Sequence, residues 1–425
     1  SHTYSKGDDQ FPLRSPAAIV RGKGSHVWDL DGNEYLDCSM GLTSVSLGHA
    51  YDAILDRVKI ELDRGVNFTR PSVLELETAG KFLSLVPQHQ MIKFAKNGSV
   101  VTTAAVKLAR AYTGRKFVAF PSDHPFFSYD DWFIGSTVCN RGVPEEISAL
   151  SVTFKSCDLD ALTALFHQYP DQIACVIMEP ERNSCNEHCS CRGNPGAYLR
   201  EAVALTRNHG AVFIADEMIT GFKTNLPGSI RKFHIDPDLS TWGKGIANGF
   251  SFCALTGKKE IMRLGGISDS NQEKVFLIST THGGETHAMA AALATIEVFQ
   301  THSVVQRNQA TGRALIEAAQ RIIKKHGLET WVDILGCDWM PGFIFRNRDL
   351  LPDLPLRTYV MQEMIARGVL FQGAFTPCFS HTSEDIEYFG EAFDETLALY
   401  AEALEHGVNE KLIGEPVRPV FRKYL

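Results

Sequence analysis

A lysine lies inside a glycine-rich segment at residues 241–249, which reads Thr-Trp-Gly-Lys-Gly-Ile-Ala-Asn-Gly. The glycines on both sides of Lys244 let a bulky group approach the amine closely, because glycine has no side chain to obstruct it. An amine in such a place can form a Schiff base with a carbonyl group, and partial loss of solvent favours its neutral, nucleophilic form. Considered alone, the segment is more typical of a surface loop with an exposed lysine.

An aspartate follows the apolar run 211–215, 28 residues before Lys244. The run predicts a buried strand, so Asp216 is expected at its carboxyl end, where it can contact a protonated ring nitrogen. At about 3 Å and an effective dielectric near 20, such a pair interacts by roughly 5 kcal/mol before desolvation is subtracted. A lone aspartate in this place is more often a turn former, but its combination with Lys244 favours a site for a cationic ring.

A third candidate segment covers residues 96–103, Lys-Asn-Gly-Ser-Val-Val-Thr-Thr, and leads into a predicted helix over 102–112. Amides at the start of a helix bind phosphate through hydrogen bonds and the helix dipole, and a glycine such as Gly98 permits close approach. Ser99 supplies a hydroxyl. The same pattern is also typical of a simple helix cap.

From about residue 75 onward, amphipathic helices alternate with short, wholly apolar strands. This alternation predicts an α/β fold with a mostly parallel central sheet covered by helices. The expected strands are 117–120, 173–178, 211–215 and 250–255, and the expected helices are 102–112, 158–168 and 198–208. Because ligands bind beyond the carboxyl ends of such strands, the residues after three of them become candidates. They are Asp123 with His124, Glu179 with Pro180, and Asp216 with Glu217.

Both chain ends differ from this central region. Strands are expected near 18–20 and 26–28, and later a helix over 304–326, strands at 343–345 and 369–371, and a helix over 383–405. We expect these parts to form one smaller α+β domain together. The predicted boundaries are 1–70 for its N-terminal part, 71–330 for the large domain and 331–425 for its C-terminal part.

Composition narrows the class of protein. The chain has 425 residues, 44% of them hydrophobic, and a formal net charge of −8. This balance excludes extended disorder and gives no basic patch for nucleic acid or an anionic membrane. No window has the length and hydropathy of a membrane span or a secretory signal, so we expect a cytoplasmic protein. The scattered cysteines are typical of thiols in a reducing compartment.

Together, the three candidate segments resemble the class III aminotransferases of the pyridoxal-phosphate fold-type I superfamily, and within them the glutamate-1-semialdehyde aminomutase branch. The resemblance runs from about residue 16 to residue 397. Further stretches that carry it are Gly-Asn-Glu-Tyr-Leu-Asp at 32–37, Leu-Ala-Arg-Ala-Tyr-Thr-Gly-Arg at 108–115, Asp-Glu-Met-Ile-Thr-Gly-Phe at 216–222 and Phe-Ser-His-Thr-Ser-Glu-Asp-Ile at 379–386.

The resemblance implies pyridoxal 5'-phosphate as cofactor and assigns roles to residues. Lys244 matches the lysine that forms the aldimine and moves the proton, and Asp216 matches the partner of the pyridine nitrogen. Gly98 and Ser99 match the phosphate-loop positions. Thr281 matches a threonine that reaches the cofactor phosphate of the neighbouring subunit, which implies a homodimer with shared active sites.

Other roles follow from the same resemblance. Glu179 matches a carboxylate that positions the ring or the substrate. His124 or Phe126 stacks on the cofactor, and the sequence does not choose between them. Arg70 is a candidate for holding a substrate carboxylate. The chain departs from the family where Val100 replaces a usual acidic residue and where Lys223 stands in place of a frequent arginine.

The implied activity is a ping-pong aminotransferase that moves an amino group from an amino-acid donor to a small carbonyl acceptor through a Lys244 aldimine. The alternative is an aminomutase that acts intramolecularly on one substrate. Glutamate is the default donor, by analogy alone. Cys185, Cys189 and Cys191 cluster near His188, but their spacing is tight for zinc, and no metal is predicted.

Overall fold

The computed structural model describes residues 3–124, 126–181, 194–270 and 273–424. The chain separates into two compact units, one formed by residues 52–302 with 423–425 and the other by residues 1–51 with 303–422. These divisions lie away from the expected positions near residues 70 and 330. The difference has a packing reason, because helix α2 (Asp52–Leu62) packs on helix α11 (Thr286–Thr301) inside the larger unit.

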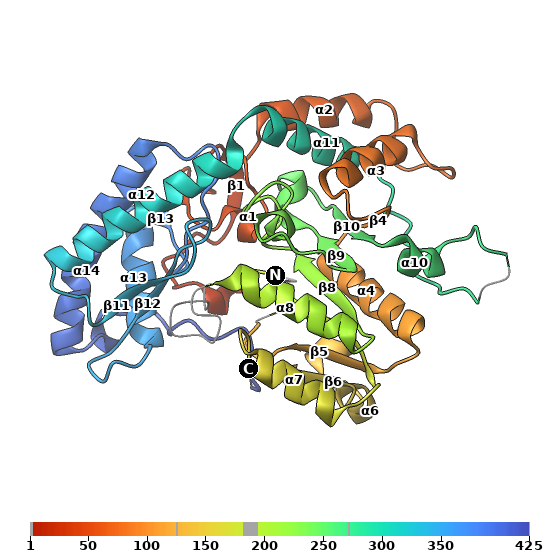
Figure 1. The fold of residues 1–425 in the computed structure, drawn as a ribbon. Coiled ribbons are helices and arrows are strands. Elements are labelled where there is room, and N and C mark those ends of the chain that lie inside the picture. Colours follow the sequence, from red (N-terminus) through yellow and green to blue (C-terminus); the bar gives the residue numbers. More distant parts are fainter. Residues whose placement is uncertain (1–2, 125, 182–193, 271–272, 425) are drawn as a thin grey trace. The chain divides into compact units, whose positions relative to one another are not determined.

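A seven-stranded sheet forms the centre of the larger unit, in the order β4-β10-β9-β8-β7-β5-β6 (Figure 1). Its strands are β4 (Met91–Ala95), β5 (Phe117–Pro121), β6 (Ser151–Phe154), β7 (Ile173–Met178), β8 (Val212–Glu217), β9 (Leu239–Trp242) and β10 (Cys253–Gly257). β10 pairs antiparallel with both β4 and β9, and the remaining pairs in this sheet are parallel, which confirms the predicted mostly parallel sheet. Every residue of β7 and β8 is buried, as expected of strands with both faces covered.

Helices connect and cover these strands. Besides α2 and α11, the larger unit has α3 (Val73–Leu85), α4 (Gly98–Thr113), α5 (Asp131–Ile134), α6 (Glu145–Ser148), α7 (Leu159–Gln168), α8 (Pro195–Asn208), α9 (Ser229–Lys232) and α10 (Lys259–Met262). The Asn97 side chain caps α4 by accepting a hydrogen bond from the Val100 amide, and Gly114 ends it in the left-handed conformation with φ 70°. Helix α4 packs against β7, β9 and β10, so the sheet fixes where its N-terminus lies.

The smaller unit joins the two chain ends. Its main sheet has the order β1-β2-β3-β13, and a second sheet pairs β11 with β12. The strands are β1 (Ile19–Lys23), β2 (His26–Asp29), β3 (Glu34–Asp37), β11 (Val332–Leu335), β12 (Gly342–Phe345) and β13 (Val369–Leu370). The helices are α1 (Met40–Thr43), α12 (Val304–Lys325), α13 (Leu354–Ala366) and α14 (Ser383–His406). Parallel pairing of β13 with β3 confirms that both ends build one small α+β body.

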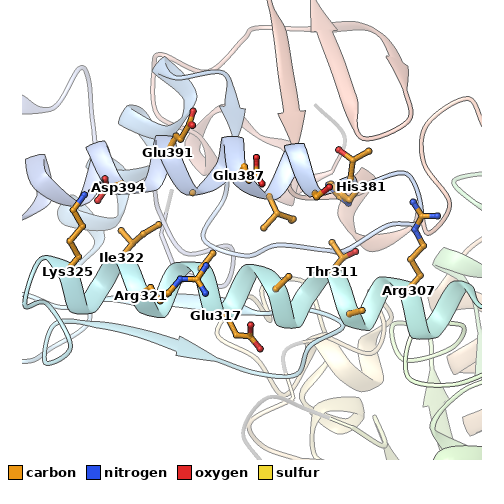
Figure 2. Close-up of a pocket in the computed structure, with 17 residues that line it drawn as sticks. Arg307, Thr311, Glu317, Arg321, Ile322, Lys325, His381, Glu387, Glu391 and Asp394 are labelled. Atoms are coloured by element: carbon orange, nitrogen blue, oxygen red, sulfur yellow. Dashed lines mark hydrogen bonds and ion pairs between the residues drawn. The ribbon is translucent and has the colours of Figure 1, made fainter.

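An aromatic cluster fills the core of the smaller unit, where Phe343 packs edge-on against Phe371 with ring centroids 5.3 Å apart. A groove of about 820 Å³ runs between α12 and α14 (Figure 2). At one end of this groove the Lys325 amine lies 2.6 Å from the Asp394 carboxylate.

Within the described residues, no single helix is long and apolar enough to cross a membrane, although α11 and α12 taken together as a bent pair meet the length and composition test.

Candidate active site

The candidate site forms where β8 and β9 end side by side. The two strands are parallel, and Asp216 lies opposite Thr241 in their register. The Thr241 hydroxyl donates a 2.8 Å hydrogen bond to the Asp216 carboxylate, and the Met218 amide donates a second at 3.0 Å. Lys244 begins a 3-10 turn two residues beyond β9 and has a left-handed φ of 47°. The strand register therefore brings Asp216 and Lys244 to the same edge of the sheet.

Electrostatics links these two side chains. Asp216 is only 4% exposed. Burial, and after it the charge of the nearby Glu179 carboxylate, raise the pKa of this carboxyl to about 7, against the hydrogen bonds from Thr241 and Met218 and the charge of Lys244. A carboxyl in this state is about half protonated at pH 7, and a cation bound next to it favours its ionised form. The edge thus offers an acid that is matched to a positively charged ring and an amine close to it.

Two glycines allow close packing of the backbone around Met218. A Cβ atom on Gly243 would lie 2.2 Å from the Met218 sulfur and 2.8 Å from the Cys253 sulfur. A Cβ on Gly98 would lie 3.1 Å from the same Met218 sulfur. Both loops therefore converge on Met218 as closely as glycine allows.

The first turn of α4 contains the two residues that we expect to bind phosphate. Gly98 and Ser99 occupy its start, and the Ser99 hydroxyl accepts a 3.0 Å hydrogen bond from the Tyr129 amide. The Thr102 hydroxyl donates to the Phe127 carbonyl at 3.0 Å, which fixes the following loop against the same helix. A helix of this length with a glycine at its N-terminus suits a phosphate group.

Two further candidates meet at the ends of β5 and β7. The Glu179 amide donates a 3.3 Å hydrogen bond to Nδ1 of His124, whose side chain is 8% exposed. Phe126 is 52% exposed and packs edge-on against Phe133, with ring centroids 5.7 Å apart. Of the two aromatic candidates, His124 is thus the buried one and the one that contacts Glu179.

Thr281 and Arg70 lie elsewhere on the larger unit. Both are exposed, and the Asn67 side chain donates a 3.0 Å hydrogen bond to the Thr281 carbonyl. Among the described residues, neither belongs to the groups that hold Asp216 or shift its pKa. The chain by itself thus assembles Lys244, Asp216, Glu179, His124, Gly98 and Ser99, and leaves these two outside.

A model of the family described as aminotransferase class-III matches residues 4–397. This chain belongs to the class-III aminotransferase family. Members of the family are pyridoxal-phosphate-dependent enzymes of fold type I, so the predicted cofactor and enzyme class are confirmed. The buried acid, the convergent glycines and the helix N-terminus fit that cofactor.

Named relatives of this class-III aminotransferase carry two kinds of activity. The chain is 30% identical over 390 residues to a 3-aminobutyryl-CoA aminotransferase of Cloacimonas acidaminovorans, covering 91% of this chain and 90% of that protein. It is also 30% identical over 421 residues to a glutamate-1-semialdehyde 2,1-aminomutase of Persephonella marina, covering 90% and 93% respectively.

Solved structures agree on the fold. The FumI protein of Sphingopyxis sp. MTA144, in a PLP internal aldimine form, superposes with a TM-score of 0.84 at 23% identity, covering 97% of this chain and 94% of that one. An omega-transaminase from Sphaerobacter thermophilus gives a TM-score of 0.82 at 22% identity, covering 93% and 94%. At these identities the likeness concerns the fold alone.

Sequence reasoning missed some residues of this aminotransferase site. Thr241 and Met218 both donate to Asp216, yet neither was a candidate, because strand register is a tertiary feature. Lys223 was noted only as a substitution, although it is 4% exposed and close enough to Lys244 to be influenced by its charge. The one sequence feature that pointed to Lys223 as a site residue is its place in the segment that follows a buried strand.

Two groups of potential metal ligands stand out in the sequence. The cluster of Cys185, Cys189 and Cys191 lies outside the described residues. His282 and His287 both contact Glu285, with N···O distances of 2.7 and 3.8 Å. Across the described ranges, no set of three or more potential ligands is arranged to hold a metal ion.

Proposed function

We propose that this class-III aminotransferase binds pyridoxal phosphate covalently through Lys244 and moves an amino group from an amino-acid donor to a small carbonyl acceptor. The observation that carries the proposal is the buried Asp216, whose raised pKa is opposed by the charge of the neighbouring Lys244. In this assignment Asp216 holds the pyridine nitrogen, and Gly98 with Ser99 at the start of α4 bind the phosphate. His124 covers the ring, and Glu179 positions the ring or the substrate.

The cofactor, when bound, supplies an electron sink that stabilises negative charge on the substrate carbon. The residues of the chain do the rest. Once the amino group of the donor has displaced it, the Lys244 amine would take the proton from the substrate carbon and return it, and the short turn after β9 fixes the backbone that carries this side chain. The Asp216 carboxylate keeps a proton on the ring nitrogen, because the pair interacts strongly where water is excluded.

Several parts of the proposal concern the substrate. Arg70 is the candidate for binding a substrate carboxylate, and its exposure suits a group that meets ligands arriving from solvent. Glutamate is the first donor to examine, by analogy with relatives. The alternative is an intramolecular reaction on one substrate, as the name of the aminomutase relatives indicates for those proteins.

We also propose a homodimer with shared sites, in which Thr281 of one subunit reaches the cofactor phosphate of the other. The exposure of Thr281 supports this, since its side chain is available to a second copy of the chain. A cytoplasmic location is part of the same proposal. It is supported by four buried cysteines that form no disulfide: Cys38, Cys175, Cys253 and Cys378.

The dimer proposal predicts complementation. Lys244→Ala and Thr281→Ala each impair both sites of their own homodimer. When the two variants are mixed and exchange subunits, one site of each hybrid has an intact Lys244 from one chain and an intact Thr281 from the other. Activity that rises above the sum of the separate variants supports the shared site. Unchanged activity in a mixture whose hybrids are verified by mass contradicts it.

Half-reactions test the function itself. The loaded protein is mixed with a panel of amino donors, beginning with glutamate, and then with keto acids and aldehydes. We expect a donor to bleach the visible absorbance and an acceptor to restore it, while Lys244→Ala does neither. Isomerisation of one substrate without free keto product would show the aminomutase instead. No change with any donor contradicts both.

A further inference from the structure

Glu285 lies four residues after Thr281 and contacts three basic side chains. Its Oε2 atom lies 2.6 Å from the Lys96 amine and 3.8 Å from Nε2 of His287, and its Oε1 atom lies 2.7 Å from Nδ1 of His282. The side chains of Lys96 and Glu285 are only 19% and 16% exposed. Water and salt screen such an ion pair less than a surface pair, so its removal has a larger effect than the removal of an exposed pair.

Lys96 lies directly before the first turn of α4. The next residue, Asn97, caps this helix, and Gly98 and Ser99 begin it. The Lys96 carbonyl accepts a 2.6 Å hydrogen bond from the Ser251 hydroxyl, and the pairing of β4 with β10 extends to the residue before Lys96. The central sheet therefore fixes the backbone of Lys96 next to the two residues that we expect to bind phosphate.

Backbone contacts hold the turn that carries Thr281. The Thr281 carbonyl accepts a 3.0 Å hydrogen bond from the Asn67 side chain. The Thr286 amide donates a hydrogen bond of 3.0 Å to the Val66 carbonyl. These two contacts hold the turn against the segment between α2 and α3, and the ion pair of Glu285 adds a connection to the start of α4.

A turn that is fixed in advance binds a ligand more tightly than a loose one. Thr281 is exposed, so ligand binding would restrict its hydroxyl and its backbone. Where the turn is already held, this restriction costs little, whereas ordering a loose turn reduces the affinity for the ligand. Hydrogen bonds also weaken when their distance and angle depart from the preferred values. The ion pair can thus affect phosphate binding although neither of its residues touches the phosphate.

We infer that Glu285 is a positioning residue whose ion pair with Lys96 holds Thr281 in place for the cofactor phosphate of the partner subunit. This inference rests on the proposed homodimer with shared sites. Because Lys96 lies beside Gly98 and Ser99, one ion pair then joins the segment that binds phosphate in the subunit's own site to the segment that binds phosphate in the other site. The effect of Glu285 through Thr281 is therefore expected in the neighbouring site.

Hybrid dimers test this inference, because the same two substitutions can be placed on one chain or on two. Lys244→Ala leaves each hybrid with one site that can form a Schiff base. In the split hybrid, one chain carries Glu285→Gln and the other carries Lys244→Ala, so the competent site receives Thr281 from a chain with intact Glu285. In the joint hybrid, one chain carries both substitutions and the other is unchanged, so the competent site receives Thr281 from the chain with Glu285→Gln.

Each hybrid is purified through two different affinity tags and titrated with pyridoxal phosphate, with the visible absorbance of the competent site as the readout. We expect the dissociation constant to be about tenfold higher for the joint hybrid than for the split hybrid, which is the size expected when a hydrogen bond to a charged group is largely lost. Lys96→Met takes the place of Glu285→Gln if that chain does not fold. As a matched control, Asp269→Asn breaks the more exposed ion pair with Arg263 and should give equal constants in the two hybrids.

Dissociation constants within about twofold of each other, or a higher constant for the split hybrid, would show that the inference is wrong. The same two hybrids made with Thr281→Ala in place of Glu285→Gln identify which proposal has failed. If Thr281→Ala separates the two hybrids and Glu285→Gln does not, only the role of Glu285 is wrong. If neither substitution separates them, the shared site itself is contradicted. Absence of the visible absorbance from the unchanged dimer would contradict the covalent binding through Lys244.

Discussion

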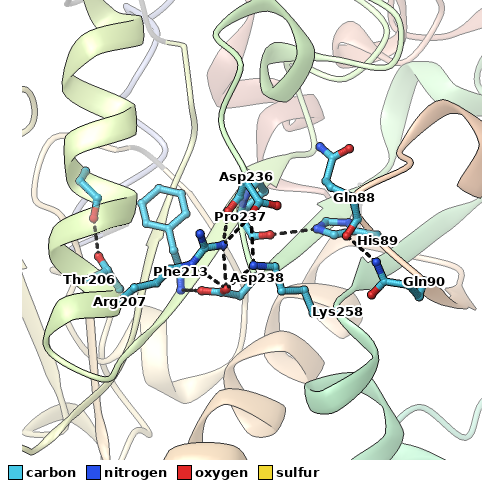
Figure 3. A network of polar contacts seen from close by, with 11 residues as sticks. Gln88, His89, Gln90, Thr206, Arg207, Phe213, Asp236, Pro237, Asp238 and Lys258 are labelled. Carbon is cyan, nitrogen blue, oxygen red and sulfur yellow. Dashed lines mark hydrogen bonds and ion pairs between the residues drawn. The ribbon is translucent and has the colours of Figure 1, made fainter.

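Two buried aspartates lie at opposite ends of strands β8 and β9, and the groups that contact their carboxylates differ. Asp238, just before β9, is bound by two cations (Figure 3). Its carboxylate lies 2.9 Å from the Arg207 guanidinium and 3.2 Å from the Lys258 amine, and accepts a 2.8 Å hydrogen bond from the Phe213 amide. Asp216, at the other end, accepts hydrogen bonds from two neutral groups, Thr241 and Met218.

The difference separates a structural role from a functional one. Two cations of the chain compensate the charge of Asp238, so this carboxylate links β8, β9 and Lys258. His89 contacts the carbonyl of the preceding residue, Pro237. Asp216 keeps a raised pKa, because burial is opposed only in part. A buried acid that the chain leaves poorly compensated is typical of a site that a ligand completes.

We expect the largest effect on the half-reaction rate from the replacement of Asp216. Asp216→Asn keeps the shape but cannot hold a proton on the ring nitrogen, so the half-reaction rate should fall about 10³-fold, equivalent to about 4 kcal/mol. Single-turnover absorbance measures it. A rate within tenfold of the parent would remove Asp216 from the chemistry.

Asp238→Asn is the matched change at the structural end. It leaves Arg207 and Lys258 without their shared carboxylate, so the free energy of unfolding should fall by about 1–3 kcal/mol. The half-reaction rate per folded protein should stay within about twofold. Equal kinetic damage from both variants would abolish the distinction between the two ends.

A pH series sharpens the comparison through stability. The pKa of Asp216 is about 7 in the folded apoprotein and near 3.8 when unfolded, so the folded state binds the extra proton between these values. Stability of the apoprotein should therefore fall by roughly 4 kcal/mol from this group as the pH rises from about 4 to about 7, and stay level above. Urea unfolding of the parent and of Asp216→Asn at each pH isolates the contribution of Asp216, because Glu217 contributes equally to the stability of the two proteins. Identical slopes in the two proteins would contradict the raised pKa.

The close packing around Gly243 predicts a smaller loss of stability and cofactor affinity. Gly243→Ala would place its Cβ 2.2 Å from the Met218 sulfur, so the free energy of unfolding should fall by about 1–3 kcal/mol and cofactor affinity should weaken. The double variant with Met218→Ala should recover part of both losses. Thermal melts and cofactor titration measure them, and a double variant no better than Gly243→Ala would show that another contact is limiting.

The smallest effect is expected at the surface. Arg70 is exposed, so Arg70→Ala should raise the KM for a carboxylate donor by at most about fivefold without changing kcat. Steady-state kinetics with glutamate tests this. A change in kcat would place Arg70 nearer the reacting atoms than its exposure indicates.

The sequence was most informative where one physical signal dominated. The wholly apolar run 173–178 became β7 with the same bounds, and the paired chain ends became one sheet. The strand expected at 250–255 begins only at Cys253, because Asn248 and Gly249 take left-handed conformations and prolong the turn. Apolar composition does not encode such a turn.

At the site, the sequence identified the residues that chemistry requires but not those that depend on register or burial. Lys244, Asp216 and Glu179 follow from strand ends and residue type. The hydrogen bond from Thr241 needs the β8–β9 register. The burial of Lys223 is a tertiary feature that its residue type does not predict, because lysines are mostly exposed.

The most direct test identifies the lysine that bonds the cofactor. The loaded protein is reduced with borohydride, digested, and its peptides are sequenced by mass spectrometry. The account predicts a pyridoxyl group on Lys244 and none on its buried neighbour Lys223. A label on Lys223, on a surface lysine, or on no lysine would contradict it.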